Sequence, residues 1–247
     1  MPNSRLTLDP IEHVHLPGLA MAMLVPAPII GALMALWIAP GPIGGAVYAL
    51  AKVWLLAMPL LWTLVIERRP MARRIAFRQM SSGRLPPGLP TGLTLGLVIA
   101  IGILGVYALF ELLGGGIDGA RLKEVATASG FGTPLSFVLL GAYLALVNSL
   151  LEEYVWRWFV FRACASMVPP IFAVTLSGLF FTLHHIVVLA AYFPIWLAAL
   201  GSLGVFIGGC VWSWCYLRFG SVWPGYVSHV IVDVAILAIG WRLLFAS

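Results

Sequence analysis

Charged residues are scarce in this chain. Of its 247 residues, only 9% are Asp, Glu, Lys or Arg, whereas 62% are hydrophobic. Soluble domains carry roughly 25% charged and 45–50% apolar residues, and a chain of this size cannot hide so much apolar surface in one water-soluble core. The composition therefore excludes an ordinary soluble enzyme, a disordered protein and a coiled coil, and it predicts a polytopic membrane protein.

Lysine and cysteine are also rare. Only two of the fourteen basic residues are lysines, and six arginines gather between positions 68 and 84. We interpret this stretch as a cytoplasmic loop that follows the positive-inside rule rather than as a nucleic-acid-binding patch, so no nucleic-acid partner is expected. The three cysteines form no CxxC motif and indicate no disulfide framework. No cleavable signal peptide is evident before the first apolar run.

Seven apolar runs are long enough to cross a membrane, at about 20 residues per span. They cover residues 19–38, 46–66, 91–113, 134–163, 171–191, 194–217 and 222–245. The Gly-rich stretch at 114–133 would add an eighth or re-entrant segment if it inserted. The sequence thus predicts an all-α membrane protein with seven or eight transmembrane helices in a single integral domain, 1–247. The basic loop predicts a cytoplasmic N-terminus, and the Arg-rich, Lys-poor usage favours a bacterial inner membrane.

Ionisable residues inside these runs are few, because each charged side chain costs roughly 2.5–3.5 kcal/mol near the bilayer centre. Lys52 lies in the second run, where we expect it to snorkel to the interface. Glu111 lies near the end of the third run, and Arg162 and Arg242 lie near the ends of the fourth and seventh. The others concentrate on three of the last four runs, and they are Glu152, Glu153, Arg157, His184, His185, His229 and Asp233. This concentration predicts a polar cavity between the helices, inside the membrane.

The spacing of these residues suggests how they are arranged. Glu153 and Arg157 are four residues apart, so they share a helix face and can pair. Glu152 lies about 100° round the helix from Glu153, so the two glutamates can have different tasks. His229 and Asp233 are also four residues apart, a spacing that lets one helix give two ligands to one metal ion. Because His184 and His185 are adjacent, we expect only one of them to face the same site.

Neutral imidazoles and carboxylates in a polar pocket suit Zn²⁺ best, although another divalent metal, or none, is also compatible with these residues. The candidate ligands are the imidazoles of His229 and of one of His184 and His185, the carboxylate of Asp233 and the two glutamates. A metal-bound water is a usable nucleophile near neutral pH, and a free glutamate beside it is the expected general base. The cluster therefore predicts hydrolysis within the membrane, with an amide bond as the expected target.

These motifs resemble the signature of the CPBP family, the intramembrane proteases that include the eukaryotic CAAX-prenyl endopeptidase and its bacterial Abi-type relatives. The pattern E-E-x-x-x-R corresponds to Glu152, Glu153 and Arg157, F-x-x-x-H to Phe181 and His185, and H-x-x-x-N/D to His229 and Asp233. Phe180 and His184 also fit the second pattern. The likeness covers a core of about residues 134–240. Two residues depart from it, because Trp156 replaces the usual Phe before the arginine and Trp158 replaces a small residue after it.

The resemblance implies an intramembrane endopeptidase that acts on a membrane-associated peptide or lipidated protein. Its implied catalytic residues are Glu152, Glu153, Arg157, His185, His229 and Asp233. By analogy, the glutamates activate water, the arginine orients a glutamate, and the remaining three fill metal or oxyanion roles. Two alternatives stay open: a proton-coupled transporter or channel with a buried relay, and a catalytically idle family member that serves as an immunity or scaffold protein.

Two further patterns concern packing. Six tryptophans, Trp212 among them, are interpreted as interface belts or lipid-facing packing. Gly204 and Gly208 have the small-xxx-small spacing of a close helix contact.

Overall fold

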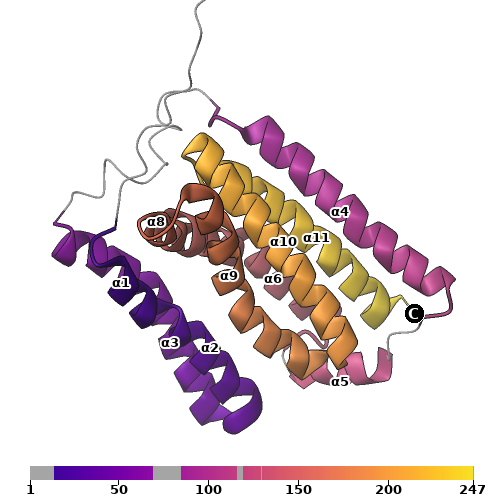
Figure 1. The fold of residues 1–247 in the computed structure, drawn as a ribbon. Coiled ribbons are helices and arrows are strands. Elements are labelled where there is room, and N and C mark those ends of the chain that lie inside the picture. The colour runs from indigo at the N-terminus through magenta and orange to yellow at the C-terminus, as the bar shows by residue number, and fades with distance from the viewer. Residues whose placement is uncertain (1–13, 69–84, 116–118, 129, 247) are drawn as a thin grey trace, which may run out of the picture.

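The computed structural model describes residues 14–68, 85–115, 119–128 and 130–246. Within these ranges the chain is almost entirely helical and contains no strand, as the composition predicts. Seven helical spans of 22–32 residues are long and apolar enough to cross a membrane (Figure 1). The basic stretch on which the predicted orientation rests lies outside the described residues, apart from Arg68.

The first, second and fourth spans contain π-helical segments, which are labelled η, and the other spans are single α-helices. The first three spans are α1 (Pro17–Leu24), α2 (Pro26–Leu33) and η1 (Met34–Ile38); α3 (Pro42–Leu61) and η2 (Trp62–Ile66); and α4 (Leu89–Leu112). The fourth comprises α6 (Pro134–Ala142), η5 (Tyr143–Asn148), α7 (Ser149–Glu152), η6 (Glu153–Phe161) and α8 (Arg162–Ala165). The last three are α9 (Pro170–Tyr192), α10 (Ile195–Phe219) and α11 (Trp223–Phe245).

A short helix, α5 (Gly119–Ala128), occupies the stretch between the third and fourth spans. Its ten residues are half of what a bilayer crossing needs. The stretch at 114–133 therefore adds no eighth span among the described residues.

Proline marks the start of every span. It occupies the first residue of a span, the second, or the position just before it. Proline suits these positions because its missing N–H has no partner in the first turn anyway. Within the first span, the helix is interrupted at Val25, directly before Pro26. The interruption is consistent with Pro26, because proline has no backbone N–H and its ring crowds the preceding turn.

The second half of the fourth span is buried inside the helix bundle. Every side chain from Val155 to Cys164 is buried, whereas the first half of the same span exposes several large apolar residues. In Figure 1, α9, α10 and α11 lie between α1–α3 on one flank and α4 on the other. Helix α9 packs along α10, and α11 packs along α4. The motif-bearing helices therefore occupy the middle of the bundle.

Two glycines on α4 allow its close packing against α11. A Cβ on Gly92 would overlap the backbone of Pro224, and one on Gly96 would lie 2.8 Å from the Cα of Ser228. This is the small-xxx-small type of contact. The expectation that Gly204 makes such a contact is wrong within this chain, because no atom of the described residues lies within 4 Å of a Cβ placed there.

Candidate active site

The two glutamates of the fourth span have different surroundings. Glu153 is completely buried, and its Oε1 lies 3.5 Å from Nε of Arg157 and 3.2 Å from Nδ1 of His229. Glu152 approaches the other side of that imidazole, with its Oε2 3.7 Å from Nε2 of His229. The ring of His229 therefore lies between the two carboxylates, and the pair that the spacing of Glu153 and Arg157 predicts is present.

Asp233 extends this cluster by one turn along α11. Its Oδ1 lies 3.9 Å from Nε2 of His229. Its Oδ2 accepts a 2.5 Å hydrogen bond from the hydroxyl of Ser149 on α7. Because Ser149 lies one turn before Glu153, this bond joins α11 to the span that carries the glutamates. Sequence reasoning missed Ser149, since a serine in an apolar span has no signal of its own.

The guanidinium of Arg157 is enclosed by two aromatic rings. Its Cζ lies 4.6 Å from the centroid of the Phe181 ring and 5.1 Å from that of Trp212. These cation–π contacts and the ion pair with Glu153 offset part of the cost of burying the charge. The arginine is fully buried, so this charge cluster is not a solvated end of a helix.

Trp212 on α10 is part of the site, which corrects the expectation that it faces lipid or the interface. Its side chain is buried, and its ring stacks on that of His229 with centroids 3.8 Å apart. Its Nε1 donates a 3.0 Å hydrogen bond to Ser228. Tryptophan is common both at membrane interfaces and in aromatic packing, so the sequence offers no signal that separates Trp212 from the others.

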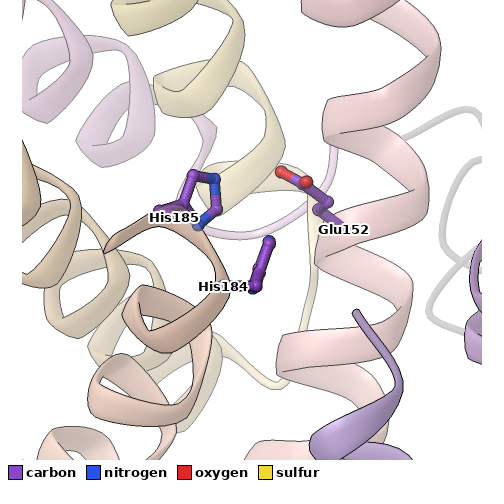
Figure 2. Close-up of side chains that lie close together, drawn as sticks. All are labelled: Glu152, His184 and His185. Atoms are coloured by element: carbon purple, nitrogen blue, oxygen red, sulfur yellow. The ribbon is translucent and has the colours of Figure 1, made fainter. Parts of the chain in front are cut away.

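His184 and His185 both approach Glu152, which corrects the expectation that only one of them faces the site. Figure 2 shows the three side chains converging, and one ligand atom from each lies within 4.8 Å of the others. Adjacent side chains on a helix diverge by about 100°. Glu152 comes from the neighbouring span, and it meets both rings.

The two histidines are held differently. Nδ1 of His185 lies 2.9 Å from the backbone oxygen of Phe181. A proton on Nδ1 makes that contact a hydrogen bond and leaves the Nε2 lone pair free. The ring of His184 stacks nearly parallel on Trp156, and its buried Nδ1 has no hydrogen-bond partner among the described residues. Trp156, one of the two departures from the family pattern, therefore supports a histidine of the site.

Lys52 reaches the edge of the site from α3. Its Nζ donates a 3.2 Å hydrogen bond to Oδ1 of Asn148, one turn before Glu152. The lysine therefore points into the bundle and does not snorkel as expected. The sequence does single out Lys52, because a charged residue near the middle of an apolar run is rare.

This arrangement is suited to hydrolysis. The buried carboxylate of Glu152 lies beside the imidazoles of His184, His185 and His229. Such a carboxylate can accept a proton from a water molecule, and the imidazoles can bind a metal ion or donate hydrogen bonds to a developing oxyanion. The site therefore contains the carboxylate and imidazole groups that acid–base hydrolysis needs.

Comparison with known proteins gives one family match. Residues 134–235 match the family model described as Type II CAAX prenyl endopeptidase Rce1-like. No curated protein and no solved structure matches the chain significantly. The matched segment begins at Pro134, the first residue of the fourth span, and ends two residues after Asp233, so it contains all three motifs. This match confirms the predicted resemblance: residues 134–235, under half of the chain, are similar to the Rce1-like type II CAAX prenyl endopeptidases.

Proposed function

We propose that this protein is an intramembrane endopeptidase that hydrolyses a peptide bond of a membrane-associated or lipidated substrate. The observation that carries the proposal is the imidazole of His229 between two buried carboxylates, 3.2 Å from Glu153 and 3.7 Å from Glu152. The family match supports a CAAX-type protease at the level of the family. A prenylated peptide is a suitable substrate, because its lipid would bring it to the membrane.

The surroundings of the two glutamates favour different roles. Oε1 of Glu153 is occupied by Arg157 and His229, and a Cβ added to Gly225 would overlap its Oε2. Glu153 therefore orients His229, and Arg157 holds Glu153 in place. Glu152 is the better general base, because its carboxylate lies among His184, His185 and His229. His229, His185 and Asp233 would then stabilise the oxyanion or bind a metal ion.

A zinc ion is a further part of this proposal. The donors fit it, because the carbonyl of Phe181 contacts only one of the two nitrogens of His185, and the buried Nδ1 of His184 has no hydrogen-bond partner among the described residues. When bound, zinc polarises a carbonyl and makes water a stronger nucleophile. Two donor sets share His185. One is the predicted set of His185, His229 and Asp233, and the other is the cluster of Glu152, His184 and His185.

Metal content distinguishes the two donor sets. We expect near-stoichiometric zinc, measured by mass spectrometry, in detergent-purified wild type and its loss in His185→Ala. If zinc is lost in His229→Ala but kept in His184→Ala, the predicted set with Asp233 is favoured. If zinc is lost in His184→Ala but kept in His229→Ala, the cluster with Glu152 is favoured. Zinc retained in His185→Ala contradicts both donor sets, because both contain His185. Zinc absent from the wild type contradicts this part of the proposal and favours a glutamate-driven hydrolysis without bound metal.

The activity itself is tested by cleavage of a prenylated reporter peptide in proteoliposomes. Glu152→Gln keeps the shape of the side chain but removes the base, so turnover should fall by about 10²–10⁴-fold. Glu124→Gln on α5 is the matched control, because Glu124 is exposed and distant in sequence from the motifs. Both variants should keep the wild-type thermal midpoint.

The same variants separate the remaining alternatives. A transporter or channel predicts that Glu152→Gln abolishes proton-linked flux across the vesicle membrane and that the wild type cleaves nothing. An idle scaffold predicts neither flux nor cleavage in any variant. Equal cleavage by the wild type and Glu152→Gln would exclude Glu152 as the base.

A further inference from the structure

We infer that Trp212 is a positioning residue, which holds the imidazole of His229 at the tilt that the proposed hydrolysis needs, and that Ser228 fixes Trp212 in turn. This inference rests on the proposed endopeptidase function and deepens it. Neither residue belongs to the three motifs, because Trp212 lies on α10, which carries no motif, and Ser228 directly precedes His229 on α11.

The two glutamates restrain the imidazole of His229 in only some directions. Its nitrogens lie 3.2 Å from Glu153 and 3.7 Å from Glu152, and the hydrogen bonds of an imidazole lie in the plane of its ring. Both contacts therefore leave the ring free to tilt about the line that joins its two nitrogens. The torsion about the Cβ–Cγ bond of a histidine has only a broad preference of its own. A contact perpendicular to the ring plane is what would fix this tilt.

The indole of Trp212 supplies that contact. Its ring lies face to face with the ring of His229, with centroids 3.8 Å apart and planes 18° from parallel. Rings stacked at this distance are in van der Waals contact, so the imidazole cannot tilt without displacing the indole. The same indole lies 5.1 Å from Cζ of Arg157. Trp212 therefore lies against both partners of Glu153.

The indole is itself held by both of the helices that it joins. Its Nε1 donates a 3.0 Å hydrogen bond to the hydroxyl of Ser228, and both residues are buried. A Cβ on Gly208, one turn earlier on α10, would lie 3.2 Å from Cη2 of the indole, and a Cβ on Gly225 of α11 would lie 3.4 Å from Cβ of Trp212. These two glycines make room for the ring. Because a buried N–H that loses its acceptor is costly, Ser228 fixes the rotation of the indole.

The kinetic test measures kcat and KM for the reporter peptide. Trp212→Leu removes the stacked face and the N–H, so kcat should fall by about 10- to 100-fold while KM stays within about twofold of the wild type. Trp212→Phe restores an aromatic face and should recover most of the lost kcat. Ser228→Ala should lower kcat by about three- to tenfold, and adding it to Trp212→Phe should cost nothing more, because both changes remove the same hydrogen bond.

Trp214→Leu is the matched control, because Trp214 lies two residues further along the same helix and is 38% exposed. It should keep the wild-type kcat. Ser228→Ala leaves the apolar contacts of the indole in place, so it tests the inference even if Trp212→Leu does not fold. Wild-type kcat in Trp212→Leu or in Ser228→Ala would overturn the inference. A raised KM with unchanged kcat would also overturn it, because Trp212 would then contact the substrate instead of positioning His229.

NMR of protein with isotope-labelled histidine gives a readout that does not depend on turnover. The ring protons of His229, assigned by their loss in His229→Ala, should lie upfield in the wild type because the indole face shields them. We expect this shift to persist in Trp212→Phe and to weaken in Ser228→Ala, where the indole can rotate. An unchanged shift in Ser228→Ala would reject the role of Ser228. If the wild type cleaves nothing, the endopeptidase proposal fails, and these shifts alone decide whether Trp212 and Ser228 orient His229.

Discussion

Glu152 and Glu153 are adjacent in the sequence, yet their carboxylates lie on opposite sides of one imidazole ring. The sequence predicts that they differ, because consecutive residues on a helix point about 100° apart. It also predicts the partner of Glu153, since Arg157 follows at the spacing of one turn. The enclosure of that arginine by Phe181 and Trp212 is not predictable from spacing, because it depends on two other helices.

At the residue scale, we predict that Gly225→Ala impairs catalysis. The new methyl group would lie against Oε2 of Glu153 and 3.4 Å from Cβ of Trp212. The carboxylate can give way only by leaving His229 or Arg157, to which its other oxygen is bound. We therefore expect kcat to fall by about tenfold, with little change in KM, in the reporter-peptide assay.

The control for this change is Gly204→Ala on α10, where a methyl group meets open space. It should cleave the peptide at the wild-type rate. Wild-type turnover in Gly225→Ala would show that Glu153 can move without consequence, and the role assigned to it would be wrong.

At the scale of elements, the fourth span alternates between α- and π-helix. Its longest π segment, Glu153–Phe161, carries both Glu153 and Arg157. Hydrophobic periodicity predicts a helix here, but it does not distinguish i→i+4 from i→i+5 hydrogen bonding over a few turns. π-Helical turns often occur at functional sites, and this one widens the helix where the site residues gather.

The packing of α4 on α11 gives a prediction at this scale. A Cβ at position 96 would lie 2.8 Å from Cα of Ser228, next to His229. Gly96→Ala should therefore push α4 away from α11 and destabilise the protein by about 1–3 kcal/mol. The thermal midpoint in detergent should fall by several degrees, and activity should fall with it.

Gly102→Ala on the same helix serves as the comparison, because nothing lies within 4 Å of a Cβ there. Alanine is a better helix former than glycine by roughly 0.5–1 kcal/mol. This variant should be as stable as the wild type or slightly more stable. If the two variants behave alike, the close contact between α4 and α11 does not contribute to stability.

At the scale of the whole molecule, seven spans place successive connections on alternating sides of the membrane. Arg162 and Arg218 end the fourth and sixth spans on one side, and the positive-inside rule predicts that this side is cytoplasmic. Leu113 follows the third span on the other side, and Met167 follows the fourth.

We predict that Leu113→Cys reacts with a membrane-impermeant maleimide on intact cells, whereas Met167→Cys reacts only after permeabilisation. Both positions are exposed, and the native cysteines would first be replaced by alanine. The opposite pattern would reverse the orientation of the protein. Labelling of both positions from the same side would contradict the seven-span topology.

The sequence by itself determined the class of this protein, its seven long apolar runs and the three motifs, whereas it left an eighth span open. Each of these depends on local information, namely composition, the length of apolar runs and residues one helical turn apart. The tertiary structure alone decided that both His184 and His185 meet Glu152, that Trp212 stacks on His229, and that Lys52 points toward the site. These contacts join helices that are far apart in the chain, and they depend on how the helices pack and rotate against one another, which periodicity within a single helix does not specify.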